Sequence, residues 1–307
     1  MIKVKLGLDM GGTSIKMALV QNNGLLLKKK SLPALSGIHM EERLNKMVDD
    51  INDMLGSEYD LQGIGIAFPG IVDFENGKIL SQYVKYPDAH TSDLRGWAFK
   101  HWKVPLIIEN DARAALIGEW QFGAGIGSKD LVMVTLGTGM GSAVLLNGQL
   151  LRGRNYLAGN LGGHMSIDFE GDQCNCGNVG CVETVGSTWA LNKNILKIKN
   201  YKESSLIANK ELSFKDVFEA AAESDSVAIE LKKRSLEAWA AAVINLLHAY
   251  DPEKVIIGGG IMESKDEIIP FIEQRVKERS WLPTQIPIMA ATQTKNAGIL
   301  GVCSLLT

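Results

Sequence analysis

The sequence has no marked excess of charge of either sign, and this excludes some classes of function. Its 32 lysines and arginines nearly balance 35 aspartates and glutamates, which gives a formal net charge of −3. General electrostatic attraction to nucleic acid or to an anionic membrane therefore has no basis in the composition. This charge balance is easier to reconcile with a small neutral or anionic ligand than with a nucleic acid or an anionic membrane.

Long apolar runs are missing as well. The nearest approach to a membrane span is AAVINLLHAY, which is shorter than the roughly 18 apolar residues required and contains Asn245 and His248. The N-terminal MIKVKLGLDM is too short an apolar run to be a secretory signal. We expect a cytoplasmic protein with neither a membrane nor a nucleic acid as partner.

Cysteine is scarce, and its distribution is uneven. Three of the four cysteines, Cys174, Cys176 and Cys181, lie within eight residues, whereas Cys303 stands alone in the apolar segment GILGVCSLL. In a reducing compartment such a cluster indicates a metal before a disulfide. Cys303 is interpreted as a small buried apolar residue.

The length of 307 residues suggests two domains that share a cleft, and the 46% hydrophobic content is enough for sizeable cores. Alternating apolar residues predict three antiparallel strands at the start, separated by the turns MGGTS and NNG. Strands and helices then alternate, which predicts an α/β fold with mixed sheets. Predicted helices cover about 40–55, 93–102 and 111–120, and predicted buried strands cover 61–68 and 104–110.

Two stretches share one order of elements. GLDMGGTSIKMALVQNNGLLL and VTLGTGMGSAVLLNGQLL, about 128 residues apart, both read as strand, small-residue turn, strand, Asn/Gly turn, strand. Either the chain carries a duplicated unit or it has two ordinary hairpins. Duplicated units that face each other would place two glycine turns across one cleft, which suits a ligand with several phosphates.

The first turn has the composition of a phosphate site. Gly11 and Gly12 lack the Cβ that would keep an anion from the backbone amides. Asp9 could hold the Mg²⁺ of ATP, and Thr13 or Lys16 could contact phosphate oxygens. Taken alone, the pattern DxGGTxxK is equally compatible with a tight hairpin. GxxxxGK[ST] and GxGxxG are both absent, while GTGMG and GGG supply two further turns at strand ends.

Asp111 follows the apolar strand VPLIIE and precedes a helix. Its ordinary role there would be to cap that helix. A carboxylate at the end of a strand can equally accept a proton from a substrate hydroxyl as phosphate arrives. The residue pattern leaves both roles open.

The cysteine cluster has the spacing CxCxxxxC, with His164 ten residues upstream of Cys174. Three sulfurs and one imidazole complete a tetrahedral zinc site, so the metal would be structural. The alternative is three unrelated buried thiols. Glu183 follows closely after Cys181, and the zinc loop would fix its position.

Together these segments resemble the ROK family (repressors, open reading frames, kinases), within the actin, hexokinase and Hsp70-type ATPase fold. The resemblance covers nearly the whole chain and rests on LDMGGTSIK, AFPG, END, LGTGMG, GGH, CNCGNVGCVE and VIIGGGI. It implies two actin-like domains with mixed sheets on either side of a cleft. The expected domains are residues 1–118, completed by a C-terminal helix at about 293–307, and residues 119–292 with a zinc-binding loop at 158–183.

The resemblance also implies ATP-dependent phosphorylation of a hexose, usually at a primary hydroxyl, with Asp111 as base and a homodimer as the assembly. The expected cofactors are ATP with Mg²⁺, and structural Zn²⁺. The residues expected to bind the sugar are Gly70, Asn110, His164 and Glu183; those expected to bind nucleotide are Asp9, Gly11, Gly12, Thr13, Lys16, Thr138, Gly139, Gly258 and Gly259; those expected to bind zinc are His164, Cys174, Cys176 and Cys181.

One position departs from the family pattern. Kinases of this family commonly carry Gly-Glu-x-Gly before the histidine, whereas this chain reads Asn160-Leu161-Gly162-Gly163-His164. Leu161 cannot make the hydrogen bond that the glutamate makes near C1 and C2 of the sugar. A substituted, phosphorylated or glycosidic sugar is therefore expected to be favoured more than in a typical member.

Two other functions are compatible with the same family. A sugar-responsive repressor would need a helix-turn-helix before the first glycine turn, and eight residues precede Asp9. A sugar-binding protein that has lost catalysis would fit Leu161. The presence of Asp9, Lys16, Asp111 and Glu183 argues for the kinase.

Overall fold

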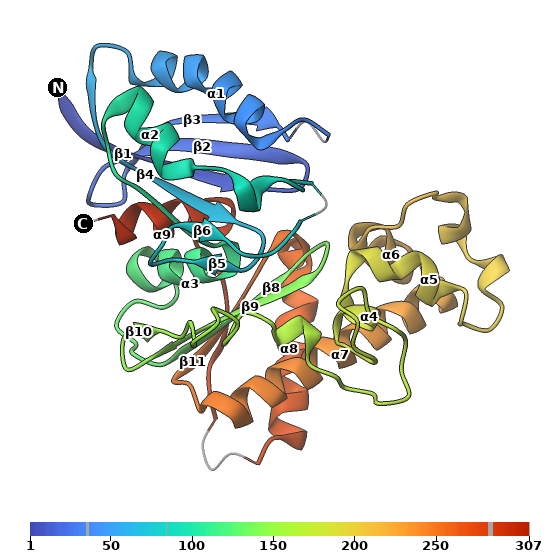
Figure 1. Ribbon diagram of the computed structural model, residues 1–307. Coiled ribbons are helices and arrows are strands. Elements are labelled where there is room, and N and C mark those ends of the chain that lie inside the picture. The colour runs from blue at the N-terminus through green and yellow to red at the C-terminus, as the bar shows by residue number, and fades with distance from the viewer. Residues whose placement is uncertain (35–36, 84, 282–284, 307) are drawn as a thin grey trace. The chain divides into compact units, whose positions relative to one another are not determined.

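A computed structural model describes residues 1–34, 37–83, 85–281 and 285–306. Within these ranges the chain forms two compact α/β units, each built on a five-stranded sheet (Figure 1). The first unit contains Met1–Gly127, Arg152–Ala158 and Thr292–Thr307, and the second contains Ser128–Leu151 and Gly159–Ala291. The boundary predicted after residue 118 falls inside a helix of the first unit.

The first sheet has the strand order β3-β2-β1-β4-β7. β2 is antiparallel to both β1 and β3, whereas β1, β4 and β7 are parallel. The predicted three-stranded start is therefore confirmed. The bounds are β1 Ile2–Met10, β2 Ser14–Val20, β3 Leu26–Pro33, β4 Tyr59–Phe68 and β7 Leu106–Asn110, and a separate small hairpin consists of β5 Val72–Asp73 and β6 Lys78–Ile79.

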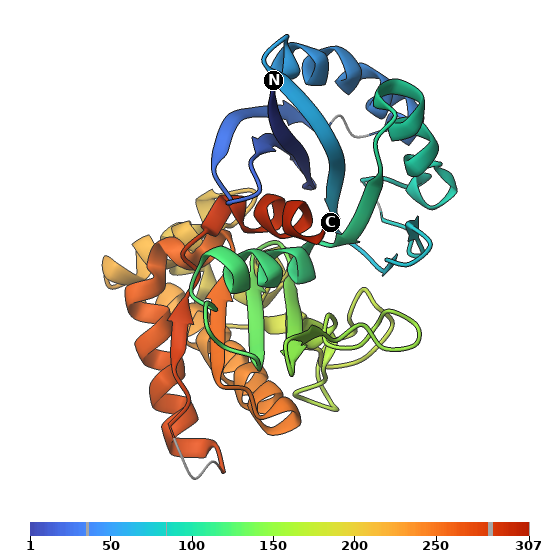
Figure 2. The same ribbon diagram turned by 90° about the vertical axis from the view of Figure 1, so that its left-hand side faces the viewer.

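Helices cover both faces of the first sheet, as Figures 1 and 2 show. α1 (Met40–Leu55) and α2 (Leu94–Trp102) pack on one face, around a core that includes Leu6 and Leu8. α3 (Asp111–Phe122) and α9 (Ala297–Leu305) pack together on the other face. Cys303 of α9 is buried in an apolar cluster, as its sequence context predicts.

The second sheet has the strand order β10-β9-β8-β11-β12. Its first three strands are antiparallel neighbours, and β8, β11 and β12 are parallel. α6, α7 and α8 contribute to the large core on one face of this sheet. The bounds are β8 Leu131–Leu136, β9 Met140–Leu146, β10 Gln149–Leu150, β11 Lys254–Gly258, β12 Ile288–Ala290, α4 Glu183–Gly186, α5 Leu191–Ile195, α6 Phe214–Ala222, α7 Ser226–Tyr250 and α8 Lys265–Arg279.

The two sheets repeat one topology. In both, three antiparallel strands in chain order are followed by two parallel strands. The glycine turns join equivalent strands, β1 to β2 in one unit and β8 to β9 in the other. This agreement supports the duplicated unit over two unrelated hairpins.

No helix in the described part of the chain is both long enough and apolar enough to cross a membrane.

Candidate active site

Polar residues gather where the parallel strands of the first sheet end. The register pairs Asp9 of β1 with Ala67 of β4, and Phe68 of β4 with Asn110 of β7. Asp111 follows as the first residue of α3. Because the carboxyl ends of parallel strands share one edge of a sheet, the predicted base and the predicted phosphate turn belong to the same edge.

Asn110, and not Asp111, caps α3. The side chain of Asn110 accepts a hydrogen bond from the backbone amide of Arg113 at 3.1 Å. Its amide nitrogen donates to the carbonyl of Gly70 and to Oδ1 of Asp111, both at 3.0 Å. The capping role that the sequence left open for Asp111 is therefore filled by its neighbour.

Asp111 is partly buried, and this burial raises the pKa of its carboxyl to about 6. The nearby Asp9 carboxylate adds to the rise, while the hydrogen bond from the backbone amide of Ala112, at 2.8 Å, opposes it. At neutral pH the group is thus mainly ionised, yet it is a stronger base than an ordinary aspartate. This is the property that a general base needs.

The first glycine turn is tightly held. A Cβ on Gly11 would lie 2.7 Å from the carbonyl oxygen of Ser14. The hydroxyl of Tyr86 donates to the carbonyl of Gly11 at 2.7 Å, and Lys16 forms an ion pair with Asp9 at 3.2 Å. Thr13 accepts a backbone hydrogen bond from Ala34. The structure thus brings the predicted nucleotide residues of this unit together around one turn.

The second glycine turn, between β8 and β9, is bound by Glu183. Oε1 of Glu183 accepts the backbone amide of Met140 at 2.7 Å, and Oε2 accepts the indole nitrogen of Trp189 at 3.2 Å. A Cβ on Gly139 would lie 2.5 Å from Oε1. Glu183, predicted to contact sugar, therefore also supports the turn in which Thr138 and Gly139 are predicted to hold phosphate.

The third glycine turn lies beside the second. Gly258 of β11 pairs with Thr135 of β8. Gly259 has φ 101°, and a Cβ there would lie 2.1 Å from the carbonyl oxygen of Leu136. Only glycine fits this contact. The second unit thus places two of the predicted nucleotide turns on neighbouring strands.

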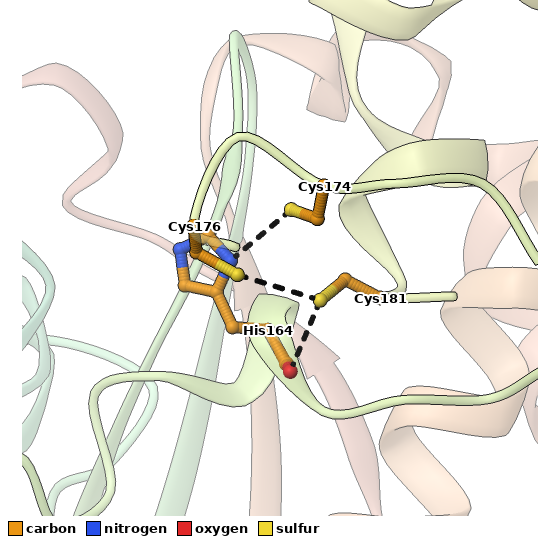
Figure 3. A group of neighbouring side chains, drawn as sticks. All are labelled: His164, Cys174, Cys176 and Cys181. Atoms are coloured by element: carbon orange, nitrogen blue, oxygen red, sulfur yellow. Dashed lines mark hydrogen bonds between the residues drawn. The ribbon is translucent and has the colours of Figure 1, made fainter. Parts of the chain in front are cut away.

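The predicted zinc ligands form a compact cluster in the second unit (Figure 3). Their ligand atoms all lie within 4.8 Å of one another. Cys174 Sγ lies 3.7 Å from His164 Nδ1, and Cys176 Sγ lies 3.7 Å from Cys181 Sγ. Tetrahedral zinc with bonds of about 2.3 Å requires sulfur separations of about 3.8 Å. The donor set and its spacing therefore fit a structural zinc ion.

The segment before His164 is packed against β9. A Cβ on Gly163 would lie 2.1 Å from the carbonyl oxygen of Met140, and one on Gly162 would lie 2.6 Å from Ser142 Oγ. These contacts place His164 near the second glycine turn. Leu161, directly before them, leaves 37% of its surface exposed.

A buried charged network near Asp111 was not predicted. Glu109 and Arg113, both fully buried, form an ion pair at 3.8 Å, and Arg152 contacts the same carboxylate at 2.8 Å. Nη2 of Arg113 also donates to the carbonyls of Tyr156 and Ala158. In the sequence, this network could have been found only from the opposite charges of Glu109 and Arg113, which lie four residues apart within otherwise apolar stretches.

The chain matches the model of the ROK family over residues 5–307. The protein belongs to the ROK family. A glucokinase of Thermotoga maritima is 34% identical over 100% of this chain and 98% of its own length. A xylose repressor of Bacillus subtilis is 31% identical over 83% of this chain and 64% of its own length.

Solved structures agree on the fold. A ROK family glucokinase from Streptomyces griseus, in complex with glucose and AMPPNP, superimposes with a TM-score of 0.80 at 26% identity, and covers 98% of both chains. A ROK family transcriptional regulator, a homologue of E. coli MLC, reaches a TM-score of 0.86 at 28% identity over 99% of this chain and 77% of its own. The predicted α/β class with mixed sheets, of the actin-like type, is confirmed.

Proposed function

We propose that this ATP-dependent sugar kinase phosphorylates a hexose or hexose derivative at a primary hydroxyl, with Asp111 as general base. The observation that carries the assignment is the Asp111 carboxyl, whose pKa is raised to about 6 by burial at the carboxyl edge of the first sheet. Its neighbour Asn110 takes the capping role, which leaves Asp111 available for chemistry. The T. maritima glucokinase, similar over nearly its whole length, supports the reaction class.

In this proposal the Asp111 carboxylate accepts the proton of a sugar hydroxyl as that oxygen attacks the γ-phosphorus of ATP. The bond from phosphorus to the bridging oxygen breaks, and ADP leaves with its electrons. Mg²⁺ held by Asp9 would neutralise charge on the phosphates. The amides of the glycine turns and Lys16 would bind phosphate oxygens.

In this proposal, residues of the chain also contact the sugar. We assign this role to Gly70 and Asn110 of the first unit, and to His164 and Glu183 of the second. The hydrogen bond from Asn110 Nδ2 to the carbonyl of Gly70, at 3.0 Å, fixes one of these pairs. Zinc at His164 and the three cysteines would be structural, because four protein ligands complete its coordination.

The deciding experiment is release of ADP with a panel of hexoses, amino sugars and glycosides. Asp111→Asn should lower kcat at least about 10³-fold while the thermal transition stays cooperative. Asp53→Asn, an exposed aspartate on α1, is the control and should turn over normally. Near-normal turnover of Asp111→Asn would disprove the base.

A regulator is the second candidate, because the xylose repressor is also similar. Tight sugar binding without ADP release across the whole panel would favour it. We further propose a cytoplasmic homodimer, and light scattering coupled to size-exclusion chromatography tests the dimer.

A further inference from the structure

Tyr83 lies in the first unit, in the loop that follows β6. Its ring contacts Phe68, the last residue of β4, edge to face with centroids 6.5 Å apart. It also stacks on Tyr86 with centroids 6.1 Å apart. β4 is the strand between β1, which carries Asp9, and β7, which leads to Asp111. The ring is therefore anchored at the carboxyl edge of the sheet, between phosphate turn and base.

The Tyr83 hydroxyl is directed at the first glycine turn. A Cβ built on Gly12 would lie 3.4 Å from this hydroxyl oxygen. The neighbouring Tyr86 hydroxyl is already used, since it donates to the carbonyl of Gly11. No hydrogen bond of the Tyr83 hydroxyl is found among the residues that the structure describes. Its proton is thus available beside the turn.

The Tyr83 hydroxyl keeps its proton in these surroundings. Burial raises the pKa of the phenol, and the negative charge of Asp111 raises it further. A neutral phenol can donate a hydrogen bond to an anion, whereas a phenolate would repel it.

We propose that the Tyr83 hydroxyl donates a hydrogen bond to a non-bridging oxygen of the phosphoryl group during its transfer. This rests on the proposed sugar kinase reaction. Tyr83 keeps its proton throughout; the sugar proton goes to Asp111, the sugar oxygen bonds to phosphorus, and ADP departs. A donor fixed beforehand at the position where charge redistributes stabilises the transition state more than the bound substrates.

The test compares Tyr83→Phe with Tyr59→Phe. The Phe ring preserves the packing of Tyr83 and removes only the hydroxyl. Tyr59 begins β4, at the end of the strand opposite Phe68, so it is a matched control. We expect Tyr83→Phe to lower kcat about 10- to 100-fold, with both KM values within about 3-fold of wild type. Tyr59→Phe should match wild type.

A second measurement separates this role from simple binding. Affinity for ADP with aluminium fluoride and sugar, which imitates the transferring group, should fall about as much as kcat. Affinity for ADP alone should not change. An unchanged kcat in Tyr83→Phe would overturn the proposal, and so would an increase confined to the sugar KM.

Failure of this proposal is distinguishable from failure of the proposed function. If Asp111→Asn loses activity while Tyr83→Phe keeps it, only the role of Tyr83 is wrong. If Asp111→Asn keeps activity, the proposed base is wrong whatever Tyr83→Phe does. Tyr83→Phe could also lower the midpoint of the thermal transition by more than about 5 °C and weaken the binding of ATP, ADP and the analogue equally. That result would also overturn the specific role of Tyr83.

Discussion

Glu109 and Arg113 form an ion pair in the interior of the first unit, with Oε1 and Nη1 3.8 Å apart and both side chains fully buried. Asn110 and Asp111 lie between them in sequence. The pair therefore brackets the proposed base, and it joins the end of β7 to the first turn of α3. Arg113 also binds the carbonyls of Tyr156 and Ala158, in a segment far along the chain.

Removal of Arg113 should be costly. Arg113→Met leaves buried carbonyls without a hydrogen-bond donor and removes one of the two positive charges next to the Glu109 carboxylate. We therefore expect a loss of about 3–5 kcal/mol in the free energy of unfolding. Arg234 and Glu230 form an ion pair with the same sequence spacing on the exposed surface of α7. Arg234→Met should cost no more than about 0.5 kcal/mol. Urea denaturation measures both, and equal losses would contradict the importance of the buried network.

Asp111 should make stability depend on pH. Its pKa is about 6 in the folded protein and 3.8 in its unperturbed state. Between these values the folded protein binds more protons than the unfolded chain, so this group lowers the free energy of unfolding as pH rises towards about 6. Asn cannot ionise. The free energy of unfolding of Asp111→Asn should therefore exceed that of wild type by about 1–2 kcal/mol at pH 7.5. This difference should disappear near pH 4.

The same carboxyl should appear in the kinetics. With ATP saturating, kcat/KM for the sugar should rise with pH through an apparent pKa near 6, because only ionised Asp111 accepts the proton. Tyr83→Phe should show the same dependence of kcat/KM on pH, with a lower maximal value. A flat profile from pH 5 to 8 would remove Asp111 from the proton transfer.

Most of the fold was predictable from the sequence, because local patterns determine it. Apolar alternation and Asn/Gly turns specified the strands at the start, and continuous apolar runs specified β4 and β7. The cluster of His164 with three cysteines was equally predictable, since the cysteines are close in sequence and the tetrahedral geometry expected for zinc limits their partners.

The contacts that were missed depend on distant residues. Glu183 contacts Met140, which lies 43 residues away, and no local pattern announces that pair. The Tyr83 hydroxyl lies beside Gly12, 71 residues away in sequence, while the Tyr83 ring packs edge to face on Phe68 of β4. Asn110 and Asp111 are both good capping residues, so only the dihedral angles and hydrogen bonds distinguish their roles.

Zinc should be present at about one ion per chain in purified protein. Cys176→Ser should lose the metal and lower the thermal transition by at least about 5 °C, because the loop around the cluster depends on it. Cys303→Ser, at a buried cysteine outside the cluster, is the control and should keep the zinc. A stable wild-type protein without metal would refute the site. Metal analysis measures the zinc content and calorimetry measures the thermal transition, and neither depends on enzyme activity.

Leu161 should set the preference among sugars. It directly precedes the packed Gly162-Gly163-His164 segment, and its partly exposed side chain offers no hydrogen bond. The resemblance to kinases of this family implies a glutamate at this position, with a hydrogen bond to the sugar near C1 and C2. Leu161→Glu should therefore raise kcat/KM for unsubstituted glucose relative to its methyl glycoside by about 10- to 100-fold. Leu196→Glu, at another exposed leucine of the same unit, should leave the ratio unchanged. If both variants shift the ratio equally, charge alone is responsible and Leu161 does not contact the sugar.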